Sequence, residues 1–281
     1  VIHYPYRNGK KINLPEYFVK RYLRVGIPMI IVAIMAYLLK VDPSDLPFWS
    51  LYCELIYYTL YPLVLWIMAK YKLSIENVIT GAFIISYLFL FIHGQDVVAF
   101  LTQSKSRALS YHYMGIYWTW LLGFPCWLLG VRIAAEYDKI KTNAISEKRI
   151  VWIRLVTFGG SVFCSIAHFH LSLSYTISMG LFSLLASFWI LNEIKFWSNR
   201  TPLSFLENGG KWSYSLYLCH MFPVAYVRYH GGTTHFLIAF AQVVSALIIS
   251  YVFYLLIEKP SHSLLRKIKF SANRPDYKVK V

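Results

Sequence analysis

The stretch FLIAFAQVVSALIISYVFYLLI, residues 236–257, decides the fold class, because its 22 consecutive residues include no charged side chain. A helix needs about 20 largely apolar residues to cross the hydrocarbon core of a bilayer. The strands of a membrane barrel would instead show runs of about ten residues with alternating hydrophobicity. This stretch therefore predicts a membrane-spanning helix.

Seven other stretches repeat this apolar pattern: residues 25–39, 48–69, 78–92, 115–135, 150–169, 173–191 and 213–227. Hydrophobic residues make up 57% of the chain and charged residues 15%, and the mean hydropathy is +0.48. These values exclude a disordered chain, a coiled coil and most soluble enzymes. We therefore expect an all-α, polytopic integral membrane protein with about eight transmembrane helices and one membrane domain over residues 1–281.

The distribution of positive charge predicts the orientation of these helices. If the N-terminus lies in the cytoplasm, the predicted cytoplasmic segments hold all but four of the 28 lysines and arginines: Lys40, Lys105, Arg107 and Arg228. Cytoplasmic loops carry such an excess of basic residues. We expect both termini in the cytoplasm, as a basic segment over residues 1–24 and a basic tail over 259–281. The net charge of +15 then indicates membrane topology and not nucleic-acid binding.

A charged side chain within a membrane span is costly and by default indicates function. Glu54 is such a residue, and Tyr57, Tyr58 and Tyr61 follow it at helical spacing. A face with a carboxylate and three phenols suits a carbohydrate. The alternative is a structural carboxylate that is hydrogen-bonded to a neighbouring helix.

His220 lies in the middle of the predicted span 213–227, with Pro223 one turn later. A histidine can act as a general base near neutral pH. The alternative is a neutral ring bonded to a backbone carbonyl that the proline leaves free.

Arg21 and Arg24 are three residues apart and just precede the first predicted span. Paired guanidinium groups can clamp phosphate, and the alternative is an ordinary basic flank that contacts lipid headgroups. No metal site is expected, because the four cysteines form no ligand pattern and two histidines, His168 and His170, make only a weak metal signal.

Three segments together resemble the acyltransferase family 3 membrane proteins, which O-acylate bacterial glycans. FVKRYLRVGIP (residues 18–28) resembles the family's R-x-x-R element, and WSLYCELIYY (49–58) its W-[ST]-L-x-x-E segment. SYSLYLCH (213–220), with YLLIEKP (254–260), is similar to the family's C-terminal motifs. The resemblance covers roughly residues 15–265.

The resemblance implies a membrane-bound O-acyltransferase that moves an acyl group, in the first instance acetyl, from acyl-CoA to a hydroxyl of a cell-surface or exported polysaccharide. It places the protein in the bacterial plasma membrane, with the lipid bilayer and a glycan acceptor as partners and without a metal. Arg21 and Arg24 would hold the phosphates of coenzyme A. The residues expected to do chemistry are Glu54 and His220, and those expected to contact substrate are Trp49, Tyr57, Tyr217 and Glu258.

One departure from the family's pattern affects the expected activity. The family's first helix carries a basic residue followed eleven positions later by the histidine taken as catalytic base, and none of the nine histidines here has that spacing. We therefore expect a chain that lacks the family's first helix pair and is inactive or very weak in transfer. A transporter of a glycan precursor and a non-catalytic family member remain the alternatives. Residues 93–114, the longest predicted external loop, are expected to select the acceptor.

Overall fold

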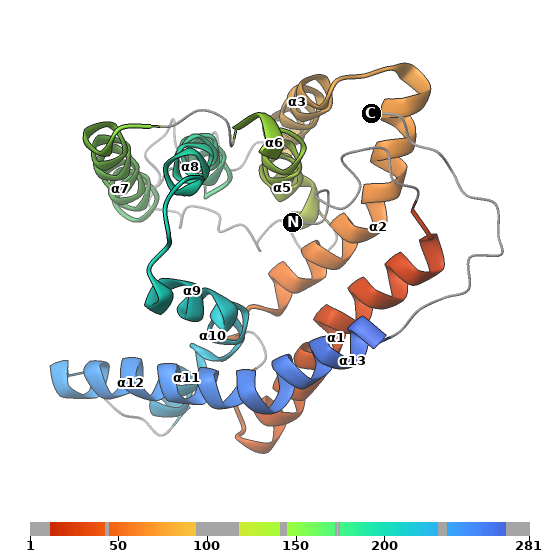
Figure 1. The fold of residues 1–281 in the computed structure, drawn as a ribbon. Coiled ribbons are helices and arrows are strands. Elements are labelled where there is room, and N and C mark those ends of the chain that lie inside the picture. Colours follow the sequence, from red (N-terminus) through yellow and green to blue (C-terminus); the bar gives the residue numbers. More distant parts are fainter. Residues whose placement is uncertain are drawn as a thin grey trace. The chain divides into compact units, whose positions relative to one another are not determined.

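The computed structural model describes residues 12–42, 45–93, 118–140, 145–171, 173, 175–229 and 235–267. These residues form helices and contain no β-strand, as Figure 1 shows. The prediction of an all-α membrane protein is therefore confirmed. Residues 94–117, which include nearly all of the predicted acceptor-selecting loop, lie outside the described part of the chain, as do residues 1–11 and 268–281.

The chain divides into two compact units. The central unit covers residues 59–201, and the terminal unit combines residues 13–58 with the described residues after 201. One helix, α2 (Phe48–Tyr71), begins in the terminal unit and continues into the central one. The other helices of the central unit are α3 (Ile75–His93), α5 (Thr119–Ala135), α6 (Tyr137–Ile140), α7 (Glu147–His170) and α8 (Tyr175–Trp197).

The terminal unit contains α1 (Leu14–Leu38) and a C-terminal series of helices. These are α9 (Ser204–Lys211), α10 (Ser213–Cys219), α11 (Phe222–Tyr229), α12 (Phe236–Phe253), the π-helical turn η3 (Tyr254–Glu258) and α13 (Lys259–Lys267). Figure 1 shows α12 running through η3 into α13 as one continuous helix. Helix α10 packs on α12, and α13 packs on α1.

Six helices among the described residues are long and apolar enough to cross a membrane, and α5 is a shorter apolar helix. Only 17–39% of the apolar window in each of the six is buried within the protein. Their remaining apolar surface needs another apolar environment, which a bilayer supplies. These helices include the stretch 236–257, from which the fold class was predicted.

Helix α1 begins earlier than the sequence predicted, at Leu14 and not at Val25. Its start is fixed by Asn13, whose side chain accepts a hydrogen bond from the backbone N–H of Glu16 at 3.4 Å. Pro15 in the first turn suits a helix start, and Glu16 complements the positive end of the helix dipole. The charged residues of this first part obscured it in the hydropathy pattern.

The predicted span 213–227 is not one continuous helix. It consists of α10 and α11, which are separated at His220 and Met221. Pro223 explains the break, because a proline has no N–H to bond a carbonyl of the preceding turn and its ring clashes with that turn. The interruption places His220 at a helix end and not in the middle of a helix.

The central unit is held together by α5 packing on α3 and α8, and by α7 packing on α8. Arg154 of α7 donates two hydrogen bonds to Glu193 of α8, at 2.6 and 2.9 Å. Glu193 also accepts from the indole N–H groups of Trp189 and Trp197. The arginine that weakened the apolar pattern of α7 is thus paired with a carboxylate, as charges within membrane helices usually are.

Candidate active site

The candidate site lies within the terminal unit, where α1, the first part of α2, α10, η3 and α13 contribute side chains. Arg21 and Arg24 were expected in a segment before the first helix. They instead lie inside α1, ~10–15 Å beyond its first residue along the helix axis. Both guanidinium groups are therefore carried by a rigid helix and not by a flexible flank.

Arg21 lies against two tyrosine rings. Its guanidinium carbon is 5.9 Å from the ring centre of Tyr17 and 5.7 Å from that of Tyr58. The Tyr17 hydroxyl also donates a hydrogen bond of 2.9 Å to the backbone carbonyl of Tyr58. These contacts fix the start of α1 against the middle of α2 and place Arg21 beside two aromatic rings. The N–H groups at its edge are the ones that bind phosphate in paired geometry.

Glu54 is half-buried and accepts a hydrogen bond from the hydroxyl of Tyr58, one turn later on α2. Tyr57 and Tyr61 are 7% and 0% exposed. The expected face of one carboxylate and three phenols is therefore closed, because these two rings offer no free surface for stacking. Tyr58, and not Tyr57, links Glu54 to Arg21.

Glu258 lies on the other side of this site and is 2% exposed. Its Oε2 accepts a hydrogen bond of 2.5 Å from the hydroxyl of Ser215 on α10. Its Oε1 is 4.0 Å from Nε2 of His262, one turn later on α13. Glu258 belongs to η3, and such π-helical turns occur frequently at functional sites.

Arg24 connects these groups electrostatically. Its charge acts on Tyr58 of α2, on Tyr214 of α10, and on Glu258 and His262 of the C-terminal helix. The side chain itself is exposed, and it forms no ion pair with any residue that the structure describes. A guanidinium in this position keeps its N–H groups available for an anionic ligand.

Two buried polar atoms have no hydrogen-bond partner among the described residues: the Tyr214 hydroxyl and Nε2 of His262. A buried polar group without a partner costs about 1–3 kcal/mol, so such groups are usually satisfied by water or by a ligand. Both lie within the field of Arg24. With the charge of Arg24, these two polar atoms suit an anionic or strongly polar ligand.

The predicted residues His220, Tyr217 and Trp49 lie apart from this cluster. Nδ1 of His220 is 2.8 Å from the backbone carbonyl of Tyr217, and the ring is exposed. His220 forms no hydrogen bond with Glu54 or Glu258. The hydroxyls of Tyr217 and Ser50 are hydrogen-bonded to each other, which joins α10 to the first turn of α2, where Trp49 is half-buried.

Sequence reasoning did not assign roles to Tyr214, Ser215 and His262, and it assigned Tyr58 only to the aromatic face beside Glu54. His262 follows Glu258 at i+4, so the pair was readable from helical spacing. Tyr214 and Ser215 lie within a quoted motif, but only packing of α10 on the C-terminal helix shows which neighbour each one has. Among the described residues, no three histidine, cysteine, aspartate or glutamate side chains are grouped so as to hold a metal ion.

Comparison with known proteins gives a family for the chain. Residues 2–255 match the family model of the acyltransferase domain of acyltransferase family 3. No curated protein and no solved structure matched the chain. The match covers the two arginines, Glu54 and the α10 motif, and ends three residues before Glu258. The protein is therefore a membrane protein that belongs to acyltransferase family 3.

Proposed function

We propose that this acyltransferase moves an acyl group, in the first instance acetyl, from acyl-CoA to a hydroxyl of a cell-surface or exported polysaccharide at the bacterial plasma membrane. The observation that carries the proposal is the cluster around Arg24. Arg21 and Arg24 form no ion pair among the described residues. The charge of Arg24 also acts on two buried groups, the Tyr214 hydroxyl and the His262 ring, whose polar atoms lack hydrogen-bond partners there. This is the arrangement expected of a site for a phosphorylated ligand.

The donor's phosphates would occupy the edge of the arginine pair. Arg21 would offer its N–H groups from its position over the Tyr58 ring, and Arg24 its own from one turn further along α1. The Tyr214 hydroxyl and the His262 ring nitrogen would supply two further hydrogen bonds to the polar chain of the donor. Arginine is favoured over lysine in such a site because its planar fork binds phosphate through two parallel hydrogen bonds.

Glu54 is the better placed of the two predicted catalytic residues, since Tyr58 connects it to the arginine cluster. In the proposed reaction, the acceptor oxygen bonds to the thioester carbonyl carbon and the carbon–sulfur bond breaks. The hydroxyl proton is taken up by a general base and ends on the thiol of coenzyme A. A carboxylate that is hydrogen-bonded to a phenol can accept and return that proton without a change in the net proton count.

The acceptor glycan is assigned from the family and from the predicted topology. We expect Trp49 and Tyr217 to contact substrate, and the Tyr217 hydroxyl is hydrogen-bonded to Ser50, the residue after Trp49. Both lie nearer than Arg24 to the end of the terminal unit where α1 passes into α2. A donor site and an acceptor site at different depths of the membrane would allow the acyl group to pass from one side of the membrane toward the other.

The test is a labelling experiment in native membranes that contain the protein. [14C]Acetyl-CoA is added, and the label is followed into polysaccharide, from which mild alkali should release it as acetate. In native membranes the proposal expects alkali-labile label in the polysaccharide, and none in membranes that lack the protein. Residues 1–281 expressed alone are expected to transfer little or no label, because none of their histidines has the family's spacing. Vesicles without acyl-CoA test the transporter alternative. Glycan flux into such vesicles, without any labelling of glycan, would overturn the proposal.

A further inference from the structure

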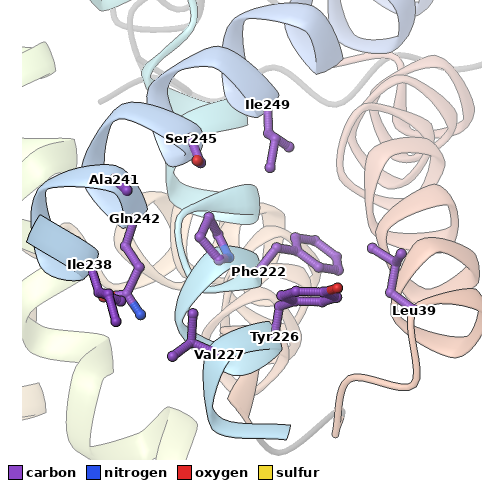
Figure 2. A pocket seen from close by; sticks show the side chains of 10 residues that line it. Leu39, Phe222, Tyr226, Val227, Ile238, Ala241, Gln242, Ser245 and Ile249 are labelled. Carbon is purple, nitrogen blue, oxygen red and sulfur yellow. The ribbon is translucent and has the colours of Figure 1, made fainter. Parts of the chain in front are cut away.

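A second site lies at the far end of the terminal unit from Arg24, where α11, α12 and the end of α1 line an open cavity of about 320 Å³. Figure 2 shows Leu39 reaching from the end of α1 toward the rings of Phe222 and Tyr226, with Ala241 on the facing helix α12. The cavity is mainly apolar. Its size is within the range of small-molecule and lipid-chain sites, about 300–1,000 Å³.

Two polar side chains of α12, Gln242 and Ser245, also line this cavity (Figure 2). Neither forms a hydrogen bond with any residue that the structure describes. Ser250 and Ser261 of the same continuous helix behave differently, since each bonds a carbonyl one turn earlier at 2.5 Å. A polar group without a partner is costly within a membrane span, so these two side chains indicate a ligand with a polar group at this depth.

A second cavity, of about 740 Å³, is lined by other residues of α1 and α11, and we call it the polar cavity because four charged side chains line part of it: Lys40, Asp42, Asp45 and Arg228. Leu39 lines the apolar cavity, and the next residue, Lys40, lines the polar one. Likewise, Val227 lines the apolar cavity and Arg228 the polar one. The polar cavity is also lined by Tyr37 and Tyr229.

The lining of the polar cavity suits a hydroxylated headgroup. Tyr37 is 83% exposed, so its ring is free to stack on a sugar. The carboxylates of Asp42 and Asp45 can accept hydrogen bonds from hydroxyl groups. Arg228 is paired with Asp45 at 2.6 Å, which offsets positive charge and makes the cavity less suited to a phosphate.

We propose that the two cavities together bind one glycolipid. A hydrocarbon chain lies in the apolar cavity, and its ester carbonyl accepts hydrogen bonds from the Gln242 amide and the Ser245 hydroxyl. The sugar headgroup lies in the polar cavity against Tyr37. A lipid is the occupant because the apolar cavity lies on a membrane-spanning helix, and a sugar head is favoured because the polar cavity, which is lined by the neighbouring residues of α1 and α11, combines exposed tyrosine with carboxylates. This site does not depend on the identity of the acyl donor.

The test uses the whole chain in nanodiscs with a glucosyl diacylglycerol that carries a diazirine on one acyl chain. After irradiation, cross-links are mapped by mass spectrometry. The proposal expects cross-links on the residues that line the apolar cavity. Ala241→Phe, which fills the cavity, should lower them at least ~10-fold, and Gln242→Leu, which keeps the size of the side chain, should lower them ~5-fold. Val243→Phe is the matched control, because Val243 is 58% exposed and does not line the cavity.

A phosphatidylethanolamine with the same diazirine chain tests the headgroup. The wild-type chain should label less with this lipid than with the glucosyl lipid, and Tyr37→Ala should remove the difference. Equal labelling of the wild-type chain by both lipids would overturn the glycolipid assignment. Labelling spread over the exposed face of α12, and unchanged in both Ala241→Phe and Gln242→Leu, would overturn the site. If the Ala241→Phe variant fails to fold, the Gln242→Leu variant still tests the site, because it keeps the size of the side chain.

Discussion

The hydroxyl of Ser215 donates a hydrogen bond of 2.5 Å to Oε2 of Glu258, and this bond joins α10 to the π-helical turn η3. Glu258 is almost fully buried, and the charge of Arg24 acts on it from α1. One carboxylate thus links three helices of the terminal unit. The Glu258 carboxylate is held by the Ser215 side chain, which is 43 residues earlier in the chain.

Replacement of Ser215 by alanine should destabilise the protein, because a buried carboxylate loses its hydroxyl donor. The cost of such a loss is about 1–3 kcal/mol. For a chain of this size, we expect the apparent Tm to fall by roughly 2–12 °C, as measured by thermal unfolding in detergent. Ser187→Ala is the control, since that hydroxyl bonds a carbonyl of its own helix and should leave Tm within about 1 °C. Equal Tm values for the two variants would show that the Ser215–Glu258 bond contributes nothing.

The Glu54–Tyr58 pair should affect turnover more than binding. Glu54→Gln removes the proposed proton acceptor and should lower kcat by about 10²–10⁴, with little change in the KM for acetyl-CoA. Tyr58→Phe keeps the ring under Arg21 and loses only the hydroxyl, so we expect a decrease of about tenfold in kcat. The measurement is initial-rate kinetics in native membranes. A rise in KM for acetyl-CoA with kcat unchanged would assign Glu54 to donor binding instead.

His220→Gln should retain transfer to within about threefold, because the ring is exposed and its Nδ1 is engaged by the Tyr217 carbonyl. Glutamine can keep a hydrogen bond to that carbonyl through its amide. A loss of 100-fold or more in kcat, with normal expression, would instead restore the general-base role that the sequence suggested.

Removal of the Arg154–Glu193 pair should affect stability and not catalysis. Glu193→Gln breaks charge-assisted hydrogen bonds that contribute about 1.5–3 kcal/mol each, less where they are partly exposed, as here. We expect a Tm lower by several degrees and an unchanged KM for acetyl-CoA, because the pair belongs to the central unit. A change in KM without a change in Tm would contradict a purely structural role.

The apolar runs of the sequence predicted the membrane helices well where charges were absent, as for the stretch 48–69 that became most of α2. They failed at the start of α1, because Lys20, Arg21 and Arg24 lower the local hydropathy although the backbone is helical there. They also failed at Pro223, where hydropathy continues but the backbone is interrupted. Hydropathy reports partitioning into lipid, and not backbone hydrogen bonding.

The candidate site was predicted in part. The arginine pair, Glu54 and Glu258 were readable, because charged residues in apolar surroundings are conspicuous. The stacking of Arg21 on Tyr58 was not readable, nor was the position of Tyr214, because both depend on packing between helices distant in sequence. Tyr57 was expected to contact substrate, and burial distinguishes it poorly from Tyr58: Tyr57 is 7% exposed and Tyr58 9%. The Tyr58 hydrogen bond to Glu54 distinguishes them.

The central claim is that Arg21 and Arg24 hold the phosphates of an acyl-CoA donor. It is tested most directly by isothermal titration of acetyl-CoA into the chain in nanodiscs, for the wild type, Arg21→Gln and Arg24→Gln. Arg149→Gln is the control, because that exposed arginine lies in the central unit. S-acetyl-N-acetylcysteamine, a thioester without phosphates, serves as the second ligand. The account predicts that each site variant weakens acetyl-CoA binding by about 10- to 100-fold and leaves the small thioester unaffected. Unchanged Kd values for acetyl-CoA in both site variants, or equal losses for the two ligands, would contradict it.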